Sequence, residues 1–225
     1  MQIHLSPTIN SEVASFWATF SDDVLGGLKA WGTPRRPVLI QSVESFDALN
    51  AEATAPVDGL LYGLADLSTV TILAPSRWPD PPDSATLKRV LTHELAHVIL
   101  FQRCGPPSRT LPVALATWFR EGMAVLASDG APTIRVYRNV GDPEYWLMNA
   151  TADAARFAVA AEQCYHVAHL LFYQWFERYG ARKLARLCRE MRDGASFAEA
   201  FHSACETSHE QYLNDTLAAL CIQLR

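Results

Sequence analysis

The chain has 225 residues, of which 49% are hydrophobic and 19% are charged, and its formal net charge at pH 7 is −5. A chain of this length can bury a sizeable core without staples, so we expect a single domain over residues 1–225. The acidic balance and the absence of clustered Lys and Arg exclude a nucleic-acid partner, and no apolar run is long enough to span a membrane. We therefore expect a soluble protein.

Cysteine usage and the first residues bear on the compartment. The five cysteines are widely spaced and odd in number, so at least one thiol is free, and no CxxC pair indicates a redox or thiolate zinc motif. We expect buried thiols in a reducing compartment. Residues 1–10 have no signal-peptide pattern, which favours the cytoplasm, although an exported protein without its leader would have the same sequence.

The first third of the chain, residues 1–82, predicts a small α+β lobe. Apolar residues at helical spacing predict a helix within residues 10–31. Three apolar runs of strand length follow, at 36–43, 60–65 and 68–74. A Pro-rich stretch then separates this lobe from the rest of the chain.

Residues 83–225 predict a mainly helical lobe. Asp83 or Ser84 can cap a helix that runs to Gly105, which suits a left-handed C-cap. A second helix is expected to start at Pro112 and to end near Gly130.

Later helices are marked by glycine breaks and caps. Helices are predicted at 157–179 and 182–192, followed by the capping boxes Ser196 with Glu199 and Ser208 with Gln211. Residues 131–154 predict an excursion or hairpin over a site. Its aromatic residues would line a substrate subsite or anchor the loop; they are Tyr137, Tyr145 and Trp146.

The clearest functional signal is the sequence HELAH, which starts at His93 and ends at His97 within the first predicted helix of the second lobe. Residues four apart share one helix face, so both imidazoles can reach one Zn²⁺. Glu94 lies beside them and can accept a proton from the attacking water without being a ligand. The pattern is typical of zinc hydrolases and predicts one Zn²⁺ per chain.

A catalytic zinc usually has three protein ligands, so a third ligand must be sought. The next histidine after His97 is the distant His166, whereas Glu121 follows His97 by 24 positions in the apolar segment WFREGMA. An unpaired carboxylate in such a segment would be costly, and metal ligation explains it. Gly122 beside it allows a close approach between helices.

HELAH followed by WFREGMA resembles the gluzincin metallopeptidases, in which HExxH precedes a helix that carries WxxEGxA. Spacing and the C-terminal part look most like the small bacterial peptidase MA-like family. The resemblance implies an α+β fold with a zincin-like catalytic core. It implies that His93, His97 and Glu121 are the zinc ligands, and that Glu94 is the general base and proton shuttle. It also implies that the strand at 68–74 is the edge along which a peptide pairs.

The same resemblance points to Tyr165 as the donor that stabilises the oxyanion. His166 and His169, three residues apart on the same predicted helix, compete for that role. One position departs from the thermolysin type, which has an Asp four residues after the Glu ligand. Here that position is Val125, so the partner of the His ligands must come from elsewhere.

The sequence therefore predicts a zinc peptidase that acts on a peptide or protein substrate. The alternative from another class is a zinc-binding scaffold or binding protein that keeps the peptidase fold without turnover. Glu94 argues against this alternative, because a scaffold has no use for a proton-carrying carboxylate beside its metal. No N-terminus-binding motif such as GxMEN occurs, so both an endopeptidase and an exopeptidase stay open.

Overall fold

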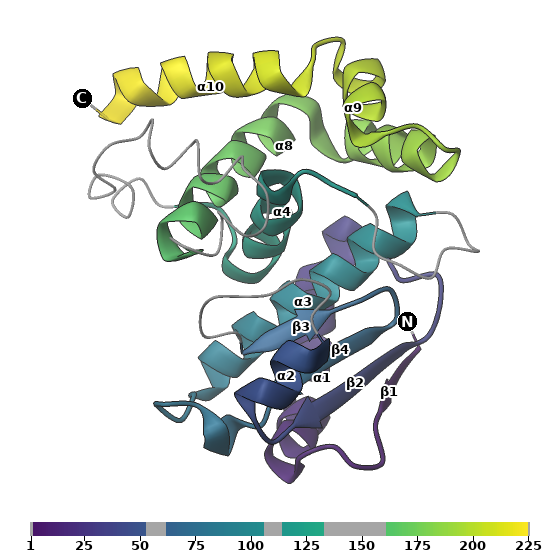
Figure 1. Ribbon diagram of the computed structural model, residues 1–225, viewed down its shortest axis with the longest axis vertical. Helices are drawn as coiled ribbons and strands as arrows, with labels where there is room; N and C mark the ends of the chain where they lie inside the picture. Colours follow the sequence, from purple (N-terminus) through teal and green to yellow (C-terminus); the bar gives the residue numbers. More distant parts are fainter. Residues whose placement is uncertain (1, 53–61, 106–113, 133–160, 225) are drawn as a thin grey trace.

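The computed structural model describes residues 2–52, 62–105, 114–132 and 161–224. It has the predicted α+β composition, with an N-terminal four-stranded mixed sheet and its helices, followed by a mainly helical part. Figure 1 shows the sheet in one half of the molecule and helices α4, α8, α9 and α10 in the other. The predicted excursion at 131–154, with its three aromatic residues, lies outside the described residues beyond position 132.

The sheet has the strand order β1-β2-β4-β3. Strands β1 (Ile3–Leu5) and β4 (Thr69–Leu73) pair in parallel with β2 (Val38–Val43), one on each side. Strand β3 (Gly63–Ala65) pairs antiparallel with β4. All three predicted runs therefore form strands. The three-residue β1 was not predicted, because so short a segment carries no readable alternation.

The edge strand beside β4 is β3, so the prediction that residues 68–74 form the edge is wrong. Strand β4 has a neighbour on both sides. The reason is a tight turn at Asp66, whose carboxylate oxygen accepts hydrogen bonds from the backbone N–H groups of Ser68 at 2.6 Å and Thr69 at 2.7 Å. This turn folds β3 back onto the open side of β4.

Helices cover the sheet. Helix α1 (Ser11–Leu28) forms as predicted, capped by the Asn10 side chain, and continues into a 3-10 turn, η1 (Lys29–Trp31). Helix α2 (Phe46–Glu52) was not predicted, since seven residues are too few for a clear period. A second 3-10 turn, η2 (Pro75–Arg77), follows β4.

Helix α3 (Ser84–Cys104) is the central element of the fold. The Asp83 side chain caps it by accepting a hydrogen bond from the Thr86 N–H at 2.8 Å. The helix packs against β3, β4 and α1, and also against α4 and α8 (Figure 1). Gly105 is extended, with φ −88°, so the predicted left-handed cap is wrong. The cause is the proline that follows, which disfavours helical φ and ψ in the preceding residue.

Helix α4 (Thr117–Asp129) begins later than predicted. Pro112 lies outside the described residues, and residues 114–116 are not helical. The predicted end near Gly130 is confirmed, because Gly130 has a φ of 75° that suits glycine.

Most of the predicted glycine breaks and caps are found in the C-terminal helices. Helix α8 (Ala161–Arg192) contains the predicted break at Gly180, where φ is 69°. Helix α9 (Phe197–Cys205) starts with a complete capping box. Helix α10 (His209–Leu224) has only half of one, because the Gln211 side chain bonds to Asp215 rather than to the cap. No helix in the described part of the chain is long and apolar enough to cross a membrane.

Cysteine pairing differs from the expectation of free thiols. A disulfide joins Cys104, at the end of α3, to Cys188 on α8. Cys164 and Cys205 are free and buried, as expected. Spacing along the sequence does not reveal which cysteines meet, so this pairing could only come from the fold.

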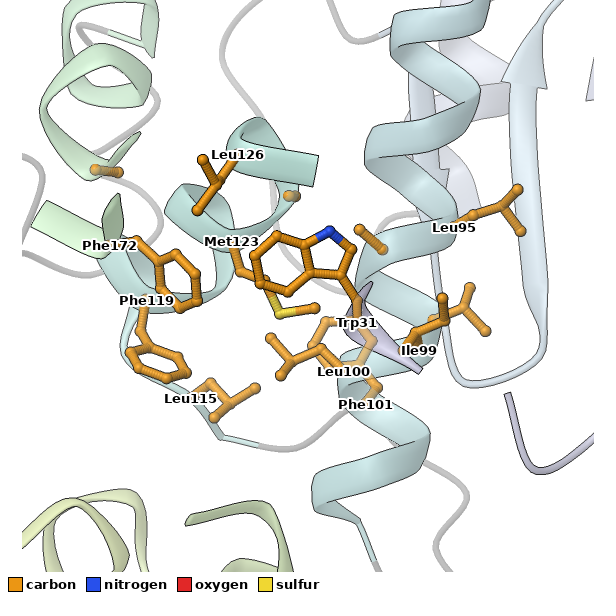
Figure 2. Close-up of a cluster of buried hydrophobic side chains, with 14 of the residues drawn as sticks. Trp31, Leu95, Ile99, Leu100, Phe101, Leu115, Phe119, Met123, Leu126 and Phe172 are labelled. Carbon is orange, nitrogen blue, oxygen red and sulfur yellow. The ribbon is translucent and has the colours of Figure 1, made fainter. Parts of the chain in front are cut away.

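The core between α3, α4 and α8 is continuous and aromatic-rich. Figure 2 shows Trp31 lying between the side chains of α3 and those of α4. The labelled members of this cluster are all buried; they are Trp31, Leu95, Ile99, Leu100, Phe101, Leu115, Phe119, Met123, Leu126 and Phe172. This packing fixes α4 against α3, which is the pair of helices that carries the candidate ligands.

Helices α4 and α8 approach each other closely at Gly122. A Cβ atom added there would overlap the Ala168 carbonyl oxygen and the Phe172 Cβ atom. Both obstacles are backbone or close to it, so they cannot rotate away. Gly122 therefore allows a close helix approach as predicted, but the approach is to α8, whereas the prediction gave it the purpose of bringing the Glu121 ligand to the metal.

We expect Gly122→Ala to lower the free energy of unfolding by about 2–4 kcal/mol, because the added methyl forces α4 and α8 apart. Gly26→Ala is the matched control: Gly26 lies in α1 with no atom near its added Cβ. That variant should gain about 0.5–1 kcal/mol, since alanine favours a helix interior. Urea unfolding of both variants measures this. Equal stability of the two would contradict the close approach.

Candidate metal centre

Three side chains from two helices converge on one point. His93 and His97 lie one turn apart on α3, and Glu121 lies on α4. The distance between the two His Nε2 atoms is 3.1 Å, and Glu121 Oε2 lies 3.4 Å from His93 Nε2 and 3.2 Å from His97 Nε2. The structure therefore brings the three predicted ligands together as a buried group that could bind a metal ion.

The size of this triangle suits a zinc ion. By plane geometry, the point equidistant from the three atoms lies about 1.9 Å from each of them. Typical Zn–N and Zn–O distances are about 2.0–2.2 Å, so an ion at those distances fits just outside the plane of the three atoms. Two imidazoles and one carboxylate are also a common donor set for catalytic zinc. The residues present therefore fit this metal.

Glu121 is held as a charged carboxylate. Burial opposes its ionisation, but His97 and His93, together with the guanidinium of Arg120, hold the pKa of Glu121 well below its ordinary value. Arg120 Nε donates a hydrogen bond to Glu121 Oε1 at 2.9 Å. Sequence reasoning missed this contact, because successive residues on a helix point about 100° apart and do not usually meet.

Glu94 lies between the metal group and the sheet edge. Its side chain is buried, and a Cβ atom added to Gly63 of β3 would come within 2.8 Å of Glu94 Cγ and 3.1 Å of Glu94 Oε1. The pKa of Glu94 is raised to about 7, chiefly because the carboxyl is buried; His93 lowers the pKa, and the charge of Glu121 raises it. The two glutamates thus have opposite electrostatic surroundings. No local signal in the sequence marks Gly63.

Tyr165 lies on α8 beside the metal group. Its ring packs edge-on against the His93 ring, with centroids 5.8 Å apart. Burial raises the pKa of Tyr165 well above its ordinary value, and the charges of Glu121 and Glu94 add to this. Its hydroxyl is therefore a protonated donor at neutral pH.

Of the two competing histidines on α8, His166 is partly buried, and His169 has a partner at the end of α4. His169 is buried, and its Nε2 lies 2.8 Å from the Gly130 carbonyl oxygen at the end of α4. Such a contact ties α8 to α4. Its ring thus already contributes to helix packing.

Within the described residues, the two candidate His ligands have fewer hydrogen-bond partners than metal-binding histidines usually have. Metal-binding histidines normally donate their second ring N–H to a carboxylate or carbonyl. His97 Nδ1 is buried and has no hydrogen-bond partner among the described residues, and Val125 offers none. The only hydrogen bond to a candidate ligand from outside the group in this part of the chain is the one that Arg120 donates to Glu121.

No protein-family model matches the chain, and no curated protein or solved structure matches it. What is established is therefore a buried His-His-Glu group in an α+β fold. Its interpretation depends on the geometry of the residues themselves.

We expect the protein to bind about one Zn²⁺ per chain. Glu121→Ala should weaken zinc binding by at least about tenfold and should also lower the thermal stability of the zinc-loaded protein, because metal binding is coupled to folding. Elemental analysis and chelator competition measure the affinity. His202→Ala, a change at an exposed histidine on α9, is the control and should bind zinc like the wild type. Equal zinc affinity in Glu121→Ala and the wild type would contradict the ligand assignment.

Proposed function

We propose that the chain is a zinc-dependent peptidase with a gluzincin-type catalytic core, the class that its two motifs resemble. The observation that carries the proposal is the place of Glu94. Its carboxylate is buried next to the three candidate ligands and lies against Gly63 on the edge strand. A structural metal site needs no proton acceptor at this position, whereas hydrolysis does.

In this proposal, each residue of the site has a separate role in hydrolysis. His93, His97 and Glu121 would hold Zn²⁺, which when bound lowers the pKa of water and polarises a carbonyl group. Glu94 accepts the proton of the attacking water and delivers it to the leaving amine. Tyr165 donates a hydrogen bond to the substrate oxygen as negative charge develops there.

The edge of β3 supports a peptide as the substrate. Leu73 N–H donates to the Tyr62 carbonyl, and Asp66 N–H donates to the Thr69 carbonyl, just before and just after β3. The backbone N–H and C=O groups of the even-numbered residues 62, 64 and 66 therefore point toward β4. By the alternation of an antiparallel pair, the backbone groups of Gly63 and Ala65 point away from β4. No strand of the described part of the chain pairs with them. An extended peptide can add to this edge and pass Glu94.

The sharpest test of the proposal separates the two glutamates. Glu94→Gln keeps the shape of the side chain but removes its basic oxygen, so zinc should stay bound at the wild-type level. Peptide hydrolysis should fall by at least about 10³-fold, because no group accepts the proton. Glu121→Ala should lose both zinc and activity. A broad peptide library, read beside zinc content, measures both properties.

Two outcomes would contradict the proposal. Loss of zinc in Glu94→Gln equal to that in Glu121→Ala would show that Glu94 is a ligand rather than a base. A wild-type protein that binds zinc but cleaves nothing in the library would indicate the non-catalytic zinc-binding scaffold.

We expect Tyr165→Phe to lower kcat by about 10² to 10³, the usual cost of losing one oxyanion donor, with zinc content unchanged. Tyr173→Phe on the same helix is the comparison and should keep its activity. Steady-state kinetics on any peptide cleaved by the wild type measures both. If Tyr165→Phe is fully active and Tyr173→Phe is not, Tyr173 is the donor.

A further inference from the structure

The two oxygens of Glu121 have different partners. Oε2 faces the two His Nε2 atoms at 3.2 and 3.4 Å, whereas Oε1 accepts the hydrogen bond from Arg120 Nε at 2.9 Å. The carboxylate is thereby oriented, with one oxygen toward the candidate metal position and the other toward a cation of the protein. A carboxylate ligand free to rotate could present both oxygens to a metal.

The contact requires the Arg120 side chain to turn toward its own neighbour. Residues adjacent on a helix do not face each other, and the Arg120 side chain is 29% exposed, so water is an alternative partner. Within the described residues, its one ion pair is nevertheless the one with Glu121, whose side chain is only 9% exposed. A cation is the natural partner for a carboxylate buried to this extent.

We propose that Arg120 is a positioning residue that keeps Glu121 a one-oxygen metal ligand. By holding Oε1, it leaves Oε2 alone to bind the ion and preserves an open coordination position, which a catalytic metal site needs for water and substrate. Its positive charge also draws electron density from the ligand and opposes the charge of the ion. Arg120 thus lowers the metal affinity of the site and, in return, leaves the bound metal with an open coordination position and less electron density from its ligand. This inference rests on the proposed metal site but not on peptide hydrolysis.

The test uses purified full-length protein reloaded with Co²⁺ or Zn²⁺. In Arg120→Met, Glu121 is free to bind with both oxygens, so the Co²⁺ coordination number rises. The visible absorption per bound Co²⁺ should fall by about half or more, because four-coordinate Co²⁺ absorbs far more strongly than five-coordinate Co²⁺. The zinc Kd should fall about tenfold, since a repulsive positive charge near the ion has been removed.

Two further variants separate the causes. Arg120→Lys keeps the charge but lacks the planar donor, so its zinc Kd should return close to wild type while its Co²⁺ absorption stays lower than wild type. Arg186→Met is the matched control, because Arg186 Nε also donates to a glutamate oxygen, Glu190 Oε1, at 2.9 Å, but on α8. It should change neither the Kd nor the spectrum.

The failures of the two proposals are distinguishable. If the wild type binds neither ion, the metal site and the proposed function fail together. If the wild type binds both ions and Arg120→Met leaves the Co²⁺ spectrum unchanged, or raises the zinc Kd, Arg120 does not set the ligation and this inference is overturned. A wild type that binds metal but hydrolyses nothing leaves the inference standing on the spectra alone.

Discussion

The buried carboxylate of Glu121 is the constraint on which the site depends. It lies on a helix whose other buried side chains are mostly apolar, and a buried charge there is tolerated only with positive partners close by. Two imidazoles and the Arg120 guanidinium surround it, and the three candidate ligand atoms form a triangle of zinc-binding size. Positive charge is therefore required by the physics of burial at this point. A divalent cation held by the three candidate ligands would meet that requirement directly.

The helical half of the molecule holds this carboxylate in place. Gly122 lets α8 approach α4 closely, and Phe119, one helix position before Arg120, contacts Phe172 and Trp175 edge-on. The preceding residue, Trp118, stacks its ring on Tyr212 of α10, with ring centroids 5.7 Å apart. Aromatic pairs of this kind each add about 0.5–1.5 kcal/mol beyond the area they bury. The C-terminal helices thus hold α4 in place by packing, and none of the three candidate ligands comes from them.

Local features of the structure could be predicted from the sequence, and features that depend on the fold could not. The caps at Asp83 and Ser196 and the break at Gly180 each act within one helical turn, so their signals are complete in a few residues. The His93 and His97 spacing is equally local. Glu121 needed one further step, the cost of a carboxylate in an apolar segment.

The missed features share a non-local cause. Strand β3 became the edge only because the Asp66 turn placed it on the open side of β4, and both strands have the same apolar character in the sequence. The pairing of Cys104 with Cys188 depends on how α3 meets α8. The Gly105 cap is an exception, because the proline after it was visible and its effect on the preceding residue outweighed the preference of glycine.

Glu94 and Glu121 have the same side chain, but their surroundings shift its pKa in opposite directions. Glu121 faces two imidazoles and the Arg120 guanidinium, which hold its pKa well below the ordinary value. Glu94 faces the backbone of β3 and the Ile72 side chain, which contacts the same Gly63 position, so burial raises its pKa toward neutrality. A side chain at Gly63 would separate the carboxylate from the strand edge. The missing Cβ atom is therefore what allows the Glu94 carboxylate to lie against the outer side of β3, with which no strand of the described residues pairs, beside the candidate metal group.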